Sequence, residues 1–403
     1  TLWFFMNRRI IKRYKRRMQM SPYTPGEVAE EVYGREPILE GIRRDLAFMT
    51  VEPRFAGRIR VFAGPRGVGK TSLLRAAQAD AERVGRLGFQ TVFVTAGDGP
   101  LLLSLIESLK EVSADWGSAV KDTFFKLLES AEVQLGPVSF GGEAGAAGAP
   151  AASQGRRLQR VLVAAGEEAQ SRSHGLVILI DEIQSADPEG LKALAYAWQQ
   201  MQSEHRDLPM AAYTAGLSHS QDVITDAVSF AERFKYQHLQ NLSRQDAEQA
   251  LRSPAAQKGV TWSEDALVAA LDLAGGYPFF IQVVGDETWQ AAGHPGPGTL
   301  IEPKQVAGAI SGFDDTRQSF FRARWQKATP AESQFLRAMA AHGEGPVRRG
   351  AIADEMGRST NDISMARRSL LDKGLIDATS HGYLEFTAPG FAEFIREESS
   401  DSL

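Results

Sequence analysis

Residues 61–72, VFAGPRGVGKTS, combine three residue types that suit the binding of a phosphate group. A glycine-rich turn lets several main-chain N–H groups converge on one anion, and a lysine adds a compact positive charge. Gly64, Gly69, Lys70 and Thr71 satisfy the spacing G-x-x-x-x-G-K-[ST], in which the lysine meets the β- and γ-phosphates and the hydroxyl binds Mg²⁺. The residues that we expect to hold a nucleotide here are Gly64, Pro65, Arg66, Gly67, Val68, Gly69, Lys70, Thr71 and Ser72.

A second group of candidate catalytic residues lies at the end of the apolar run LVILIDEIQ, residues 176–184. Such a run predicts a buried parallel strand, and ligands of parallel sheets bind at the carboxyl ends of the strands. We expect Asp181 to hold Mg²⁺, directly or through water, and Glu182 to polarise the attacking water as a general base. Together with Lys70 at the phosphates, these residues predict binding and hydrolysis of an ATP-type triphosphate.

Short runs rich in β-branched residues predict the strands that position these groups. Four of them cover residues 58–63, 90–96, 175–181 and 209–215, and a fifth, more polar run covers 235–242. Helical patterns separate the runs, which indicates an α/β fold with a parallel sheet covered on both faces. Residues 136–155 are rich in Gly, Ala and Pro, and we expect a flexible insertion or surface loop there.

The rest of the chain has a helical pattern, in which Ser243 and Ser263 are the expected N-caps of two helices. From about residue 325 the sequence predicts three helices and then a β-hairpin, which is the order of elements in a winged helix-turn-helix. We therefore expect four parts in chain order: a basic arm at 1–20, a P-loop ATPase core at 21–242, a helical lid at 243–324 and a winged-helix domain at 325–403.

The stretch RSTNDISMARRSLLDKGL, residues 358–375, is the predicted recognition helix, capped by Ser359 or Thr360. Polar side chains at its amino end would face base edges, and its basic side chains would contact DNA phosphates. The expected base-facing residues are Ser359, Thr360, Asn361 and Ser364, and the expected phosphate contacts are Arg358, Arg367, Arg368 and Lys373. Residues 330–403 carry eight basic and twelve acidic side chains. The alternative to DNA binding is therefore a winged helix that serves protein contacts or acts as a switch brake.

Two further stretches resemble the ATPase domains of STAND and origin-recognition-type AAA+ proteins. VYGREPILEGI, residues 32–42, resembles the hydrophobic-Gly-Arg-Glu box of these families, and the resemblance implies that Gly34 and Arg35 lie over the adenine. GGYP, residues 275–278, is similar to the Gly-x-Pro motif of STAND lids and implies that Pro278 packs near the nucleotide.

A third stretch, SFAERF at residues 229–234, is similar to a segment that follows the fourth strand in these families. There an arginine can reach the γ-phosphate of a neighbouring subunit, a role that would fall to Arg233; a surface arginine or a structural ion pair is the alternative. In order, the matches cover most of the chain, and they look closest to prokaryotic ATPases with a C-terminal winged helix.

Two positions depart from the AAA+ pattern. Thr214 stands where AAA+ proteins often have a sensor asparagine, and no arginine follows GGYPFFIQ within the next turns, where a lid arginine is usual. Among such proteins, these departures imply a slow nucleotide switch rather than a processive ring motor.

The composition excludes several other classes. The chain has no cysteine, hence no disulfide or thiolate metal site, and no apolar run approaches the roughly 18 residues of a membrane-spanning helix. The net charge is −5 although residues 1–20 carry seven basic side chains and no acidic one, so the acidic remainder is no general nucleic-acid binder. We expect a cytoplasmic protein. The basic arm at residues 1–20 is expected to be disordered or to precede a native start near Met18 or Met20. The alternative is an arm that touches nucleic acid or anionic lipid.

These observations predict an ATP-binding, slowly hydrolysing molecular switch that couples its nucleotide state to a DNA-binding winged helix. The expected ligands are ATP or ADP with Mg²⁺, the expected macromolecular partner is double-stranded DNA, and ATP binding is expected to favour a homo-oligomer. The alternative is a STAND-type signalling or scaffold ATPase that oligomerises with ATP and uses the winged helix for protein contacts. An accessory ATPase of mobile-element or plasmid maintenance is a third possibility.

Overall fold

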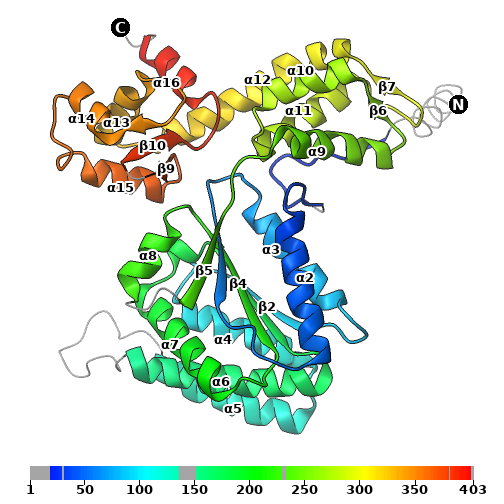
Figure 1. Ribbon diagram of the computed structural model, residues 1–403, viewed down its shortest axis with the longest axis vertical. Coiled ribbons are helices and arrows are strands. Elements are labelled where there is room, and N and C mark those ends of the chain that lie inside the picture. Colours follow the sequence, from blue (N-terminus) through cyan, green and yellow to red (C-terminus); the bar gives the residue numbers. More distant parts are fainter. Residues whose placement is uncertain (1–18, 30, 136–150, 229–232, 381, 401–403) are drawn as a thin grey trace, which may run out of the picture. The chain divides into compact units, whose positions relative to one another are not determined.

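The computed structural model describes residues 19–29, 31–135, 151–228, 233–380 and 382–400 (Figure 1). The chain forms two compact units. The first contains the described residues up to 34, residues 65–69 and the chain from 240 onward, and the second contains residues 35–64 and 70–239. Among the described residues, no helix has the length and apolar character that crossing a membrane requires.

The second unit is built on a five-stranded parallel sheet in the order β2-β3-β4-β1-β5. The strands are β1 Ile59–Ala63, β2 Gln90–Thr95, β3 Leu176–Asp181, β4 Met210–Gly216 and β5 Phe234–His238. The first four agree with the predicted strands within one residue at each end, and the fifth ends earlier than predicted. The α/β parallel sheet expected from the apolar runs is therefore confirmed.

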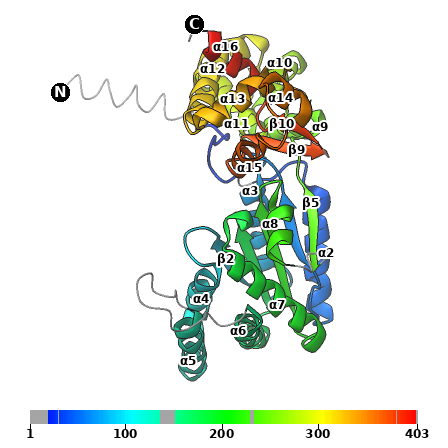
Figure 2. The same cartoon turned by 90° about the vertical axis from the view of Figure 1, so that its left-hand side faces the viewer.

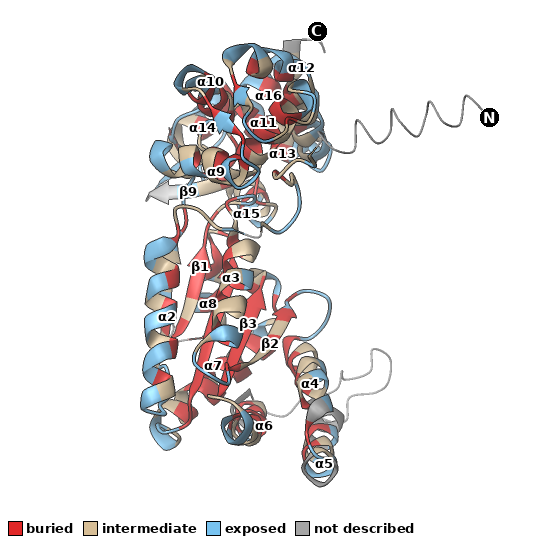
Figure 3. Cartoon of the chain, turned by 90° about the vertical axis from the view of Figure 1, so that its right-hand side faces the viewer, coloured by how far each residue is buried: buried red, intermediate tan, exposed pale blue. Residues whose placement is uncertain are grey.

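Helices cover both faces of this sheet. They are α2 Glu36–Val51, α3 Lys70–Arg83, α4 Leu101–Val112, α5 Ser118–Leu135, α6 Ala151–Arg172, α7 Pro188–Glu204 and α8 Ser220–Ala227. In β3, Ile178 and Ile180 pack with side chains of α4 to α7, whereas Val177 and Leu179 are buried outside that cluster, on the opposite face, as the alternation of a strand requires. Figure 3 shows β1 and β3 coloured mostly as buried and α2 with one buried and one exposed side.

The prediction of a loop at residues 136–155 is wrong for its last part. Residues 136–150 lie outside the described residues, but residues 151–155 form the first turn and a half of α6. Alanine and glutamine favour a helix, and Gly155 lets α7 approach closely, because a Cβ there would lie 2.6 Å from the Tyr196 Cβ. Packing against α7 thus extends a helix into a segment whose composition resembles a loop.

The first unit contains a helical region, and residues 19–24 pack against it. Its helices are α9 Arg244–Gln257, α10 Glu264–Ala274, α11 Pro278–Ala291 and α12 Pro303–Trp325, with a short ladder of β6 Thr261–Trp262 and β7 Leu300–Ile301. Ser243 and Ser263 cap α9 and α10, as predicted. Tyr23 is buried among these helices, where its hydroxyl donates to the Leu251 carbonyl at 2.5 Å.

The C-terminal part of this unit combines helices with a small antiparallel sheet. Helices α13 Pro330–Ala340, α14 Arg349–Glu355, α15 Ser364–Asp372 and α16 Phe391–Ser400 accompany the strands β8 Val347–Arg348, β9 Ile376–Ser380 and β10 Tyr383–Phe386. The strand order is β8-β10-β9. Figure 2 shows β9 and β10, which pair antiparallel. The three helices and the hairpin were predicted, whereas β8 and α16 were not.

The predicted start of the recognition helix is wrong. We expected Ser359 or Thr360 to cap the helix, but its N-cap is Ile363 and α15 begins at Ser364. The Ser359 hydroxyl and main-chain N–H both donate to the Asp362 carboxylate, at 2.7 Å and 3.0 Å. This local turn replaces a helical turn, because Ser and Asp side chains compete for the main-chain groups of a helix.

One ion pair connects α13 to the end of α15. The Lys373 Nζ lies 2.5 Å from the Glu332 Oε2, and the Glu332 side chain is only 4% exposed. Glu332 also closes a capping box with Thr329 at the start of α13. Burial alone raises the pKa of Glu332, but hydrogen bonds from Lys373, Ser369 and the Thr329 main chain outweigh it and lower the pKa to about 2.

We predict that the replacement Glu332→Gln destabilises the fold by about 2 kcal/mol at pH 7, because the Lys373 ammonium loses its anion while the glutamine can still cap α13. The cost stays below the roughly 3–5 kcal/mol of a fully buried pair, since the Lys373 side chain is partly exposed. Urea denaturation followed by circular dichroism measures the difference.

The same difference should depend on pH. The folded-state pKa lies below the ordinary value of about 4.3, so the ionised pair stabilises the fold above that pH and its effect is lost as the pH falls toward 2. Asp372→Asn is the control, because the Arg368–Asp372 pair is half exposed and its removal should change the stability by less than about 0.5 kcal/mol. Equal effects of both replacements would contradict the prediction.

Candidate functional site: a glycine-rich loop and an acidic strand end

The loop between β1 and α3 has the conformation that a phosphate-binding turn needs. Gly67 and Gly69 have φ angles of +79° and +91°, which residues with a side chain rarely adopt. Lys70 is the first residue of α3, so the free N–H groups at the start of that helix follow the loop directly. The loop and the helix therefore both offer main-chain donors to an anion.

Lys70 lies at the end of this loop. Its side chain is buried, and its Nζ donates a hydrogen bond to the Gly64 carbonyl at 2.9 Å. The buried ammonium therefore lies beside the start of the loop, where we expected it to meet the phosphates. Of the other predicted loop residues, Val68 is buried, Ser72 is half-buried and Arg66 is exposed.

The structure brings Thr71 and Asp181 into direct contact. The Thr71 hydroxyl donates to the Asp181 Oδ2 at 2.6 Å, although the two residues are 110 positions apart in the sequence. The second oxygen of Asp181 accepts from the Glu182 main-chain N–H at 2.9 Å. Helix α3 packs against β3 and β4, so its first turn reaches the carboxyl end of β3. The two predicted metal ligands therefore form one oxygen-rich group.

Glu182 follows directly, in a conformation that is uncommon for a residue with a side chain. Its φ of 52° and ψ of 40° are left-handed, and its carbonyl accepts from the Ser185 N–H at 2.7 Å. Such a conformation costs of order 1 kcal/mol and persists where the surroundings determine it. The turn ends β3 and leaves the Glu182 side chain half-buried beside Asp181.

Sequence reasoning missed Gln184. Its amide N–H donates to the Glu182 carboxylate, and its Oε1 accepts from the Leu217 main-chain N–H at 2.9 Å, just after β4. By contrast, the Thr214 hydroxyl donates weakly to the Arg60 carbonyl of β1, at 3.4 Å. After β4, the main-chain N–H of Leu217 is thus the group that contacts the turn at Glu182–Ser185. Nucleotide sensing by Thr214 stays a prediction.

The predicted adenine box is divided between the two units, with Gly34 in the first and Arg35 in the second. Gly34 has a φ of +69°, and a Cβ on it would lie 2.8 Å from the Asp246 Cγ of α9. Only glycine fits this approach. Arg35 is buried and precedes α2, which begins at Glu36. Their predicted contact with adenine is untested.

Pro278 begins α11, and the residue before it makes a contact that the sequence did not predict. The Tyr277 hydroxyl donates to the Arg66 carbonyl at 2.6 Å, within the first unit. Burial raises the pKa of Tyr277 to about 12, although Arg324 and Arg66 lower it. Arg324, near the end of α12, lies over the Phe320 ring at 3.3 Å from its centroid. Arg324 is half-buried, and it lies later in the chain than the turns after GGYPFFIQ.

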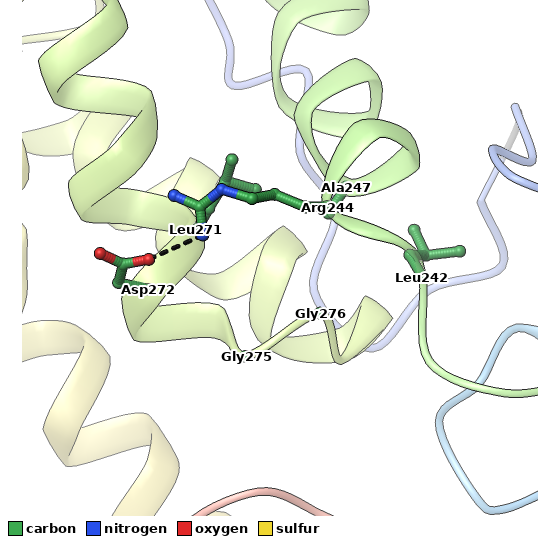
Figure 4. Close-up of a pocket in the computed structure, with 7 residues that line it drawn as sticks. All are labelled: Leu242, Arg244, Ala247, Leu271, Asp272, Gly275 and Gly276. Atoms are coloured by element: carbon green, nitrogen blue, oxygen red, sulfur yellow. Dashed lines mark hydrogen bonds and ion pairs between the residues drawn. The ribbon is translucent and has the colours of Figure 1, made fainter.

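The helical region also contains a hollow of about 370 Å³. It is lined by Leu242, Arg244, Ala247, Leu271, Asp272, Gly275 and Gly276 (Figure 4). An ion pair of 2.8 Å between Arg244 and Asp272 lies at this hollow, and both side chains are more than half exposed. Gly276 is required there, because a Cβ on it would lie 2.7 Å from the Leu242 carbonyl oxygen.

Arg233 is the one residue of SFAER that the structure describes; residues 229–232 lie outside the described part. It precedes β5 and is half-buried, and its Nε is a buried atom with no hydrogen-bond partner among the described residues. Whether it reaches a neighbouring subunit is untested.

Two of the predicted phosphate contacts of the C-terminal part already have partners. The Lys373 ammonium binds Glu332 and also donates to the Lys327 carbonyl at 2.9 Å, and Arg368 lies 3.6 Å from Asp372. Arg358 is exposed and makes one long contact, 3.4 Å, to Gln334. Arg367 is half-buried.

The predicted base-facing residues fall into the turn before α15 and its first residue. Ser359, Thr360 and Asn361 are exposed, and Ser364 is half-buried. The Ser364 hydroxyl donates to the Thr360 carbonyl at 3.0 Å, and the Arg349 guanidinium donates to both residues. These contacts stabilise the turn, and they occupy the Ser364 hydroxyl that we expected at a base edge.

Two family models match the sequence. Residues 31–213 match the AAA ATPase domain, and residues 318–395 match a domain of unknown function, DUF8462. The first match contains the glycine-rich loop, Asp181 and Glu182. A search of curated proteins by sequence gave no match.

Solved structures show the same fold over nearly the whole chain. The Walker-type ATPase of Pyrococcus abyssi is 16% identical, with a TM-score of 0.56 over 93% of this chain and 98% of that one. The ORC2 protein of Aeropyrum pernix, solved in ADPNP and ADP complexes, is 13% identical, with a TM-score of 0.51 over 95% and 100%. These similarities show the fold, and the match of residues 31–213 supports an AAA-type P-loop ATPase domain.

Proposed function

We propose that the chain is an ATP-binding, slowly hydrolysing switch whose nucleotide state controls a C-terminal winged helix that binds DNA. The observation that carries the ATPase part is the 2.6 Å hydrogen bond between the Thr71 hydroxyl and Asp181. It joins the nucleotide loop to the acidic end of β3, which is what a magnesium-dependent triphosphatase requires.

The oxygen atoms of this pair suit Mg²⁺. A hydroxyl and a carboxylate are hard ligands, and Mg²⁺ is usually bound by one or two such groups together with phosphates and waters. Thr71 and Asp181 would hold the ion, which neutralises charge on the phosphates when it is bound. The Lys70 ammonium and main-chain N–H groups of residues 66–72 would bind the phosphate oxygens.

Glu182 is the proposed general base. It lies next to Asp181, and its carboxylate can accept a proton from a water that attacks the γ-phosphate. ORC2 of Aeropyrum pernix, which shares this fold, was solved with ADPNP and ADP, and this supports a nucleotide as the ligand. A slow rate is proposed because no arginine follows Pro278 within the next turns of α11.

The contact between Tyr277 and the Arg66 carbonyl supports coupling to the lid. The hydrogen bond joins the residue before α11 to the centre of the nucleotide loop. A loop that closes around phosphates changes the position of that carbonyl, so the lid and the loop would respond together. ATP binding is also proposed to favour a homo-oligomer, with Arg233 as a candidate for the contact between subunits.

The proposed DNA contacts are fewer than the sequence predicted. Arg358 and Arg368 are the exposed basic residues of the predicted set, and Arg368 is paired with Asp372. Arg358 and the exposed turn of Ser359, Thr360 and Asn361 are therefore the proposed DNA contacts. We no longer propose a phosphate contact for Lys373, since its ammonium binds Glu332.

A scaffold ATPase is the second candidate function. Residues 330–403 contain eight basic and twelve acidic side chains, and this net negative charge favours a protein partner over DNA. In that case ATP would drive assembly and the C-terminal part would bind protein.

We predict that Glu182→Gln binds ATP with unchanged affinity but hydrolyses it at least about 100-fold more slowly, because an amide cannot accept the proton of the attacking water. Calorimetry measures binding and phosphate release measures hydrolysis. The control is Glu189→Gln, whose carboxylate is exposed and paired with Lys192 at the start of α7. Unchanged phosphate release by Glu182→Gln would contradict the role of this residue.

We predict that the ATP-bound protein shifts a random-sequence DNA duplex in an electrophoretic assay and that the affinity falls with salt. Arg358→Gln should weaken binding and lower the slope of log affinity against log salt by about 0.9, the value of one lost phosphate contact. Lys304→Gln, an exposed lysine on α12, is the control. ATP-driven assembly in light scattering without any DNA shift would favour the scaffold instead.

A further inference from the structure

The side chain of Gln184 connects the proposed base to the end of a neighbouring strand. It lies in the 3₁₀ turn Ile183–Ser185, two residues after Glu182. Its amide N–H donates to the Glu182 Oε2, and its Oε1 accepts the main-chain N–H of Leu217 at 2.9 Å. One amide therefore bridges the turn after β3 and the turn after β4.

The far end of this bridge is held firmly. Leu217 is buried, and its carbonyl accepts from both the main-chain N–H of Ser220, at 2.8 Å, and the Ser220 hydroxyl, at 2.5 Å. Gly216 leaves room for the amide, because a Cβ there would lie 2.6 Å from the Gln184 Oε1. The position of the Gln184 amide is thus set by the start of α8 and the end of β4.

The main chain of Glu182 is fixed, but its side chain depends on Gln184. The Glu182 N–H donates to Asp181 and its carbonyl accepts from Ser185, so both main-chain groups are occupied. Gln184 is the only donor to the Glu182 carboxylate among the described residues. Without it, the torsions of the glutamate side chain would be unrestrained on the solvent side.

We infer that Gln184 is a positioning residue for hydrolysis: it holds one oxygen of Glu182 so that the other faces the attacking water. This inference rests on the proposed role of Glu182 as general base. The bridge also makes the position of the base depend on the end of β4. A general base acts only when its oxygen lies within hydrogen-bond reach of the water, so a loose carboxylate loses rate without loss of substrate binding.

The test compares steady-state kcat and KM for ATP hydrolysis in full-length variants. Gln184→Met has nearly the same volume but neither donor nor acceptor, and we expect kcat to fall about 10- to 100-fold with KM within about twofold of the wild type. Gln184→Glu can still accept from Leu217 but cannot donate to Glu182, so it should lose a similar factor. Gln159→Met is the matched control, since Gln159 is a buried amide that donates to the Glu204 carboxylate at 2.7 Å between α6 and α7; its kcat should stay near the wild type.

A double variant separates positioning from a general structural effect. In single-turnover measurements, Glu182→Gln with Gln184→Met should be no slower than Glu182→Gln alone, because Gln184 acts only through the glutamate. The inference is overturned if Gln184→Met keeps the wild-type kcat, or if it lowers the rate equally in both backgrounds. If Glu182→Gln itself keeps full activity, the proposed base is wrong, and that result is distinct from a failure of Gln184 alone.

Discussion

The hydrogen bond between Thr71 and Asp181 is the interaction on which the candidate site depends. It requires that the first turn of α3 and the carboxyl end of β3 meet, although β4 lies between β3 and the strand that leads into the loop. Parallel pairing aligns the ends of β1, β3 and β4 at one edge, and the packing of α3 on β3 and β4 brings its amino end there. Every proposed step of nucleotide chemistry uses this edge.

Around that bond, the neighbouring groups are held by turns rather than by long side chains. Gly67 and Gly69 turn the loop, the left-handed Glu182 ends β3, and Gly216 makes room after β4. The two long side chains of the site are themselves held, Lys70 by the Gly64 carbonyl and Glu182 by Gln184. In this account the glycine-rich loop, Lys70, Thr71 and Asp181 bind the nucleotide, whereas hydrolysis also needs Glu182 and Gln184.

Local sequence patterns predicted much of this fold, because strand burial and helix capping depend on residues close together in the chain. The apolar runs predicted the strands, and Ser243 and Ser263 were predicted as caps because an N-cap bond spans only three residues. The loop and Asp181 were predictable from spacing, but their 2.6 Å contact needed the sheet order. Gln184 and the pair Lys373–Glu332 were missed because their partners are set by tertiary packing. The wrong boundary at Ala151 was decided by packing against α7, which composition does not contain. The one at Ser364 was decided by the local turn of Ser359 and Asp362, which the helical pattern of apolar residues did not reveal.

The most direct test of the account is the Mg²⁺ dependence of ATP affinity, measured by calorimetry in Mg²⁺ and in EDTA. The replacement Asp181→Asn keeps an acceptor for the Thr71 hydroxyl but removes the charge that would hold the ion. The account predicts that the wild type binds ATP more tightly in Mg²⁺ than in EDTA, and that Asp181→Asn loses this difference while its affinity in EDTA is unchanged. An equal gain from Mg²⁺ in both proteins would contradict it.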